Sequence, residues 1–269
     1  MIRLADVSLS DTALHQLERW QAEVDSLATY PERVEAAKQR FSLRNKAKDK
    51  TFSVVRRALT TMCAGARRCG YCEDSAADEV EHIWPKDLYP ELVFAWRNYL
   101  YACGPCNGPK NNRFAVLPKG ARKPLEVGRR PDTPIKPPRK GTPALIDPRH
   151  EDPMAFLMLD LRGTFLFLPI PAKGSRDRAR AEYTLDLLRL NARELLPVAR
   201  AEAFSGYRAR LSEYVSLRDQ GAPKAALARR IQSIQGAAHP TVWKEMQRQY
   251  PMLPELRLLF RKAPEALRW

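Results

Sequence analysis

Two pairs of cysteines, each with two residues between them, constrain this chain more than any other feature of its sequence. Cys69 and Cys72 form the first pair and Cys103 and Cys106 the second, with thirty residues between the pairs. Two intervening residues let both sulfurs turn toward one point, and four thiolates are the ligand set of a closed, tetrahedral structural zinc site. Without an export signal, this pattern favours zinc over disulfides. Cys63 is expected to be a small buried hydrophobe, not a ligand.

Length and composition restrict the fold class and the compartment. The 269 residues suit one or two domains, and the 44% of hydrophobic residues can form a buried core. No run of about 18 apolar residues is present, so we expect no membrane-spanning helix. The first residues lack the apolar stretch of a secretory signal, which leads us to expect a cytoplasmic protein.

The charge of the chain points to a polyanionic partner. Lys and Arg number 46 and Asp and Glu 31, which gives a net charge of +15. Nucleic acid is the usual partner of such a basic protein, and the alternative is a solvated surface that keeps the chain soluble. Much of the imbalance lies in residues 32–68, where eleven residues are basic and three acidic.

Apolar periodicity predicts an α+β protein that is mostly α-helical. Helical spacing of leucines and valines predicts a helix over residues 10–28, and Pro31 begins a second one. Asn191 is expected to cap a later helix with a core-facing stripe of Leu195, Leu196 and Val198. Two strands around a turn with Gly163 are expected at 155–160 and 164–169, and further helices at 52–62, 223–236, 241–249 and 254–260.

These patterns divide the chain into four segments. Residues 1–66 form a basic helical segment, and residues 67–116 contain the cysteine pairs. Residues 117–150 are rich in proline and in basic residues, which forbids a helix and favours an extended strap. This strap is either a linker or an arm that lies on nucleic acid. Residues 151–269 hold the hairpin and a C-terminal helical region.

Four polar residues near the cysteines form a candidate site for phosphodiester cleavage. The neutral imidazole of His82 can take a proton from water near pH 7. The adjacent carboxylate of Glu81 and the amide oxygen of Asn107 are hard ligands for a divalent metal that neutralises the phosphate. Asn98 can fix the loop that carries His82, or the ring itself. Because neighbouring strand residues point to opposite faces, we expect Glu81 and His82 at a strand end or bend.

Two basic residues precede the first cysteine pair. Arg67 and Arg68 are candidates for phosphate contact, and the alternative is a solvated helix end. The chain contains no G-x4-G-K-[ST] phosphate loop, so we do not expect it to hydrolyse ATP.

The strings CGYC, EH, WRN and CGPCNGPK, spread over residues 69–110, resemble the HNH endonucleases, or ββα-metal nucleases, of the four-cysteine type. The resemblance implies a ββα-metal module with structural Zn²⁺, embedded between helical segments. It also implies hydrolysis of DNA with one catalytic divalent metal, Mg²⁺ or Mn²⁺.

The resemblance assigns a role to each residue of the candidate site. It makes His82 the general base and Asn98 the middle asparagine of the motif. Glu81 and Asn107 take the positions of the metal ligands, and Lys110 that of a lysine that holds a phosphate.

A looser resemblance is carried by PKDLYPELVFAWRNYLYAC, LIDPRHEDP and YTLDLLRLN and extends from Cys69 to about Arg200. It is to the HNH nucleases of bacterial antiphage systems, of the Septu PtuB and retron-associated types. It implies a role in defence against phage and a separately encoded ATPase partner of the PtuA kind.

A non-catalytic function is the alternative. The same four cysteines can support a zinc module that presents a basic surface to nucleic acid or to a protein partner. Such a module has no need of Glu81, His82, Asn98 and Asn107, so metal-dependent cleavage of DNA distinguishes the two functions.

Overall fold

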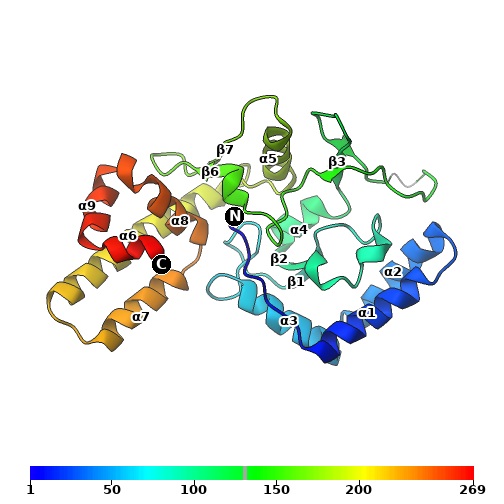
Figure 1. Ribbon diagram of the computed structural model, residues 1–269, viewed down its shortest axis with the longest axis horizontal. Helices are drawn as coiled ribbons and strands as arrows, with labels where there is room; N and C mark the ends of the chain where they lie inside the picture. Colours follow the sequence, from blue (N-terminus) through cyan, green and yellow to red (C-terminus); the bar gives the residue numbers. More distant parts are fainter. Residues whose placement is uncertain (130–131) are drawn as a thin grey trace.

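The computed structural model of the chain describes residues 1–129 and 132–269 and shows a helix-rich α+β fold with small antiparallel sheets (Figure 1). The predicted fold class, α+β and mostly α-helical, is confirmed. None of the described helices has the length and apolarity needed to cross a membrane. The α-helices are α1 Asp11–Asp25, α2 Tyr30–Arg44, α3 Lys50–Met62, α4 Gly104–Lys110, α5 Arg176–Leu187, α6 Leu195–Asp219, α7 Lys224–Gln235, α8 Pro240–Gln249 and α9 Pro254–Lys262. The strands are β1 Glu79–His82, β2 Tyr99–Ala102, β3 Ala115–Leu117, β4 Leu125–Glu126, β5 Thr142–Pro143, β6 Leu157–Leu159 and β7 Phe167–Pro169.

The three N-terminal helices pack through aromatic side chains. A capping box starts α2, because Thr29 accepts a hydrogen bond from the backbone N–H of Glu32 while the Glu32 carboxylate accepts one from the backbone N–H of Thr29. Trp20 of α1 stacks on Phe52 of α3 at 6.1 Å between ring centroids, and Phe41 of α2 meets Phe52 edge-on at 5.5 Å. The aromatic side chains of these helices form the surface against which β1 and β2 pack.

The strands β1 and β2 form an antiparallel hairpin, and α4 follows it directly. His82 is the last residue of β1 and pairs with Tyr99, the first residue of β2. The connection of residues 83–98 contains two short 3-10 helices, η1 Pro90–Leu92 and η2 Trp96–Asn98. The expectation of a strand end at Glu81 and His82 therefore agrees with the backbone.

The strap, residues 117–150, pairs in part with the strand before it. β3 lies between β4 and β5 in a three-stranded antiparallel sheet. Arg176, at the start of α5, donates hydrogen bonds to the carbonyl of Leu117 at 3.0 Å and to the hydroxyl of Thr142 at 3.2 Å. Arg130 and Pro131, which belong to the strap, lie outside the described residues. Leu125–Glu126 and Thr142–Pro143 thus hold two separate parts of the strap against β3.

The predicted hairpin is confirmed, with shorter strands. β6 and β7 pair antiparallel, with Met158 opposite Leu168. The carboxylate of Asp160 accepts hydrogen bonds from the backbone N–H groups of Arg162 at 2.9 Å and Thr164 at 3.0 Å, which closes the turn. The first predicted strand is shorter because residues 153–155 form a 3-10 helix, η3 Pro153–Ala155.

The helices of the C-terminal region lie close to their predicted positions, but the prediction for Asn191 was wrong. Its side chain accepts a hydrogen bond from the backbone N–H of Phe167 at 2.9 Å and donates one to its carbonyl at 2.8 Å, so it braces β7. Leu195 and Val198 are 79% and 57% exposed, whereas Leu196 is buried. A helix turns about 100° per residue, which puts Leu196 and Val198 on opposite sides of α6.

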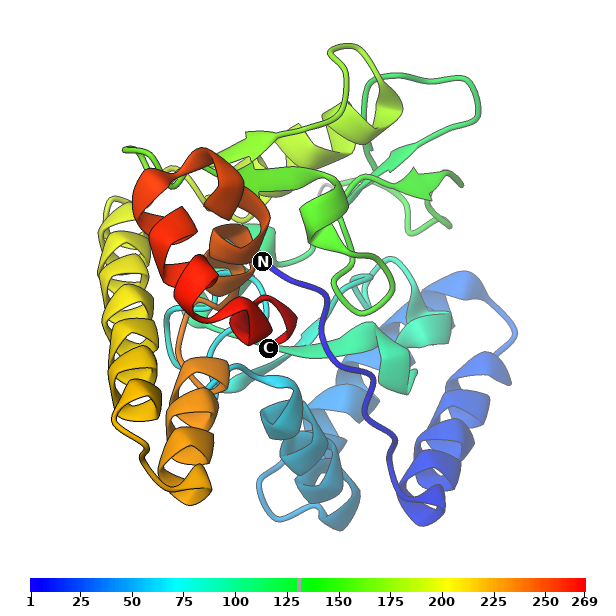
Figure 2. The ribbon, with the colours of Figure 1, turned by 60° about the vertical axis from the view of Figure 1, so that its left-hand side comes forward.

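One contiguous core runs through the described residues, from Met1 to Ala266. The buried α-ammonium group of Met1 lies 3.2 Å from the carboxylate of Glu73, and Thr241 of α8 donates a hydrogen bond to the same carboxylate at 2.6 Å. Figure 2 shows the N-terminal segment running across the molecule between the C-terminal helices and α1. Because Glu73 directly follows Cys72, this contact joins both ends of the fold to the first cysteine pair.

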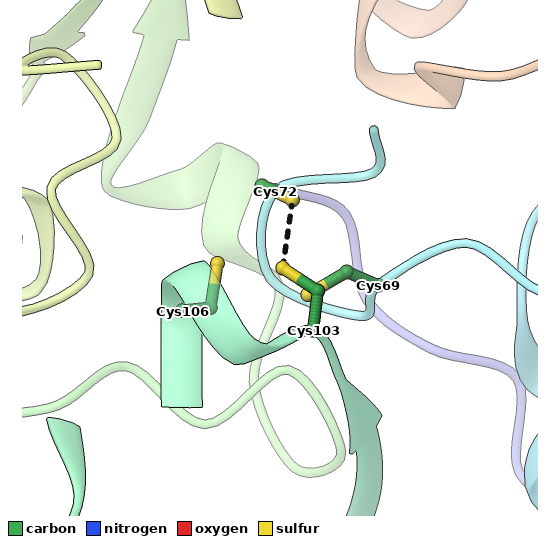
Figure 3. A group of neighbouring side chains, drawn as sticks. All are labelled: Cys69, Cys72, Cys103 and Cys106. Atoms are coloured by element: carbon green, nitrogen blue, oxygen red, sulfur yellow. Dashed lines mark hydrogen bonds between the residues drawn. The ribbon is translucent and has the colours of Figure 1, made fainter. Parts of the chain in front are cut away.

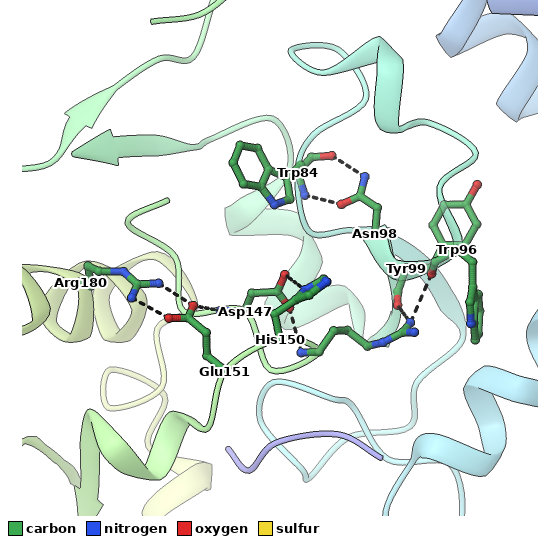
Figure 4. A network of polar contacts seen from close by, with 9 residues as sticks. Trp84, Trp96, Asn98, Tyr99, Asp147, His150, Glu151 and Arg180 are labelled. Carbon is green, nitrogen blue, oxygen red and sulfur yellow. Dashed lines mark hydrogen bonds and ion pairs between the residues drawn. The ribbon is translucent and has the colours of Figure 1, made fainter. Parts of the chain in front are cut away.

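Arg149 joins the end of the strap to β2. Its buried guanidinium donates hydrogen bonds to the carbonyl of Tyr99 at 2.6 Å and to that of Trp96 at 3.3 Å, and it lies 4.6 Å from the Trp96 ring centroid. Figure 4 shows the carbonyls of Trp96 and Tyr99, which lie where the connection from β1 joins β2.

Replacing Arg149 by Met is expected to destabilise the fold by about 2–4 kcal/mol, because two buried carbonyl groups lose their donor. Urea unfolding followed by circular dichroism measures this loss. Arg162→Met, at an exposed turn position, is the control and should change stability by less than about 0.5 kcal/mol. Equal stability of the two variants would contradict the structural role of Arg149.

Candidate functional site

The four cysteines of the two pairs meet in one buried cluster (Figure 3). Cys69 and Cys72 lie in the loop before β1. Cys103 follows β2 directly and is the N-cap residue of α4, and Cys106 lies in the first turn of that helix. Their sulfurs all lie within 4.8 Å of one another, and those of Cys72 and Cys103 are 3.7 Å apart. The cluster therefore fastens the loop before the hairpin to the helix after it.

The geometry of the cluster fits a tetrahedral metal. Sulfurs at about 2.3 Å from zinc lie about 3.8 Å from one another, which matches the 3.7 Å between Cys72 and Cys103. A disulfide needs about 2.05 Å, and all five cysteines are free. The guanidinium of Arg193 donates to the Cys106 sulfur at 3.2 Å and the backbone N–H of Tyr71 to the Cys69 sulfur at 3.4 Å, as suits thiolates. The four cysteines can hold a structural metal such as zinc.

His82 is buried in its neutral form. Its Nε2 lies 2.9 Å from the carbonyl oxygen of Val93, which can only accept a hydrogen bond, so Nε2 carries the proton and Nδ1 the lone pair. The ring also meets Phe41 edge-on at 4.4 Å between centroids. Burial, and then the positive charge of Lys86, lower the pKa of His82 to about 3. The imidazole is therefore an unprotonated base near pH 7.

Glu81 and Lys110 form a buried ion pair. The side chain of Lys110 is 0% exposed, and its ammonium contacts the Glu81 carboxylate and donates to the carbonyl of His82 at 2.8 Å. Burial raises the pKa of Glu81, and the ammonium beside it opposes that rise. Lys110 was predicted to contact a phosphate, but in the structure its charge is paired and shielded from solvent.

Asn107 lies at the same place as Glu81 and His82. These three residues line one cavity of about 90 Å³ between β1, α2 and α4. The amide nitrogen of Asn107 donates a hydrogen bond to the carboxylate of Glu79, which leaves its amide oxygen as the free end. Three of the four predicted site residues are thus brought together.

Asn98 acts on the connection that follows His82 and is not among the residues that line the cavity. Its side chain accepts a hydrogen bond from the backbone N–H of Trp84 at 2.8 Å and donates one to the carbonyl of Trp84 at 3.0 Å (Figure 4). It also donates to the carbonyl of Leu92 at 3.0 Å. Of the two expectations, contact with the loop or with the ring, the structure shows the loop. Asn98 thus holds this connection in place.

The two arginines before the first cysteine differ in their surroundings. Arg68 donates to the carbonyl of Asp74 and so braces the loop of the first cysteine pair. Arg67 is exposed, with its guanidinium 5.8 Å from the Tyr101 ring centroid. Arg67 is the more exposed of the two, and contact of either residue with phosphate stays a prediction.

Sequence reasoning missed several residues of the site. Phe41 and Lys86 line the cavity, and Glu79 orients the Asn107 amide. Glu79 had a signal, because it lies two residues before Glu81 and alternate strand residues share a face. Phe41 had none, since α2 lies about forty residues away in the chain.

The donor atoms at the cavity suit a hard divalent cation. A carboxylate, an amide oxygen and an imidazole are present, and Mg²⁺ commonly binds through one or two carboxylates while keeping several waters. A cation there would share the Glu81 carboxylate with Lys110 or displace its ammonium. Across the described residues, the cysteines are the only group of three or more His, Cys, Asp or Glu placed to hold a metal.

We expect the purified protein to contain one zinc per chain. Cys106→Ala should abolish zinc binding and cooperative unfolding, because a structural site contributes its binding energy to folding. Elemental analysis and thermal melts measure both. Cys63→Ala is the matched control, since Cys63 lies outside the cluster. Zinc retained in Cys106→Ala would refute the assignment.

Burial of neutral His82 should make stability fall at acid pH. Below pH 6.5 the unfolded chain protonates this imidazole, whereas the folded chain does so only near pH 3, so stability is lost as the pH falls between these values. Relative to His82→Gln, the wild type should lose up to about 1.4 kcal/mol per pH unit. Urea titrations across this range test the slope, and parallel curves would argue against burial of the neutral ring.

Comparison with known proteins identifies one curated relative. Over 48 residues the chain is 52% identical to the Septu protein PtuB of Bacillus thuringiensis, and the matched segment covers 16% of this chain and 19% of that protein. No family model matches the chain. No solved structure matches it either. Over this segment, then, the chain is similar to a Septu protein.

Proposed function

We propose that this protein is a metal-dependent endonuclease of the HNH type that hydrolyses phosphodiester bonds in DNA. The observation that carries the proposal is the convergence of Glu81, His82 and Asn107 on one cavity. A neutral imidazole beside two oxygen donors is the set that activation of water near a phosphate requires. The order β1, β2, α4, with the cysteine cluster at its base, supports the ββα-metal resemblance.

In this mechanism His82 takes the proton of the attacking water at Nδ1. Because Nε2 donates its proton to the Val93 carbonyl in a hydrogen bond, the ring is held in the tautomer that leaves Nδ1 unprotonated. Asn98 holds the connection that carries Val93 and so keeps the ring in place. Glu81 and Asn107 would hold the divalent cation, which supplies neutralisation of the phosphate charge when bound.

The distribution of charge supports DNA as the substrate. Lys136, Arg139 and Lys140 of the strap are exposed, and none forms an ion pair within the described part of the chain. With a net charge of +15, such cations favour a phosphate backbone. This supports the strap as an arm on nucleic acid over a simple linker.

The similarity to a Septu protein supports a role in antiphage defence. We propose that the chain is the nuclease component of such a system and acts with an ATPase partner of the PtuA kind. The absence of a phosphate loop from the sequence agrees with this division of work.

One observation favours the alternative of a non-catalytic zinc module that binds nucleic acid or a protein. Lys110 pairs with Glu81 in the interior, which occupies the carboxylate proposed as a metal ligand. If this pair never opens, the cavity is structural and the basic surface alone is functional.

His82→Ala tests the proposal. We expect the wild type to nick plasmid DNA, EDTA to stop nicking, and added Mg²⁺ or Mn²⁺ to restore it. The variant should lose at least about 10²-fold in rate, the usual contribution of a general base, while keeping its zinc. His15→Ala, at an exposed position on α1, is the control. Nicking by His82→Ala at the wild-type rate would exclude His82 as the base.

A further inference from the structure

Lys86 is a cation at the cavity with no role in the site described so far. It lies in the loop after β1, half-buried, and lines the cavity with Glu81 and His82. Its ammonium lies 5.7 Å from the Phe41 ring centroid. Among the described residues, no ion pair or hydrogen bond engages it.

Lys86 and Lys110 are the two lysines near the candidate base, and their surroundings differ. The ammonium of Lys110 is fully buried between Glu81 and the His82 carbonyl, and Lys110 does not line the cavity. Moving it would leave the Glu81 carboxylate buried without its partner, which is strongly unfavourable. Lys86 can move without such a loss, because a cation–π contact at a partly exposed site is weaker than a charge-assisted hydrogen bond.

A phosphate that enters this cavity meets the Glu81–Lys110 pair, whose opposite charges cancel and offer it no net attraction. A positive charge is needed on the same wall, on a stem long enough to follow the phosphate. Lys86 meets both conditions, since its four-carbon chain is flexible and its ammonium, which lies over the Phe41 ring, has three donors. Its charge also reaches His82, where it helps burial to lower the pKa of the imidazole.

We propose that Lys86, and not Lys110, binds the scissile phosphodiester of DNA in this cavity. The assignment rests on the proposed nuclease function and makes Lys86 a substrate-binding residue beside the base.

DNA binding without catalysis tests this assignment. A fluorescent DNA duplex is titrated with His82→Ala protein in EDTA over a series of salt concentrations. Adding Lys86→Met should weaken binding about tenfold and reduce the slope of log K against log salt by about 0.9, the value of one phosphate contact. Lys262→Met, an exposed lysine at the end of α9, is the matched control and should leave the slope unchanged. Equal slopes for the Lys86 and Lys262 variants overturn the proposal.

A second set of measurements separates binding from folding. Lys86→Met should keep the melting temperature of the wild type, and Lys86→Arg should restore binding, whereas Lys110→Met should lower the melting temperature. If the wild type nicks plasmid and Lys86→Met does so with unchanged kcat/KM, Lys86 is not the phosphate ligand and the nuclease function stands. If no metal supports nicking but Lys86→Met still lowers the salt slope, the phosphate contact stands and the nuclease function fails.

Discussion

The meeting of four cysteine sulfurs within 4.8 Å is the constraint on which the rest of the candidate site depends. The hairpin β1–β2 has only four residues in each strand, and α4 has seven, so none of them is stable alone. The cluster fastens the loop before the hairpin to the first turn of α4. Because Asn107 follows Cys106, this connection also sets where its amide lies relative to Glu81 and His82.

Buried charges connect this small unit to the rest of the molecule. Glu73, beside the cysteine cluster, meets the α-ammonium of Met1 and the hydroxyl of Thr241. Arg149 reaches from the strap to the backbone of β2. Each of these groups gains stability only because its partners are in place, since an unpaired buried charge is costly. Their contacts therefore specify how the segments assemble around the site.

The same physical rule separates the two lysines near His82. Lys110 is paired with Glu81 in the interior and belongs to the structure. Lys86 lies at the cavity wall against an aromatic ring and keeps its charge available. In the sequence both are lysines close to a motif, and only burial distinguishes a structural cation from one that can meet a phosphate.

The sequence alone determined the parts that depend on local pattern. The spacing of the cysteines predicted one cluster, which the structure shows, and periodicity predicted the helices and the hairpin of β6 and β7. The convergence of Glu81, His82 and Asn107 also followed from adjacency to strands and cysteines. These features depend only on residues close together in the chain or on a shared metal, so a single sequence is enough to predict them.

Only the tertiary structure decided which partner each polar group meets. It turned Asn191 toward β7 in place of a helix cap, buried Lys110, and brought Phe41 against His82. In each case the partner is fixed by packing of segments distant in sequence, so no local pattern encodes it. A residue type shows which bond a side chain can make, and the fold alone determines whether that bond is made to protein, water or substrate.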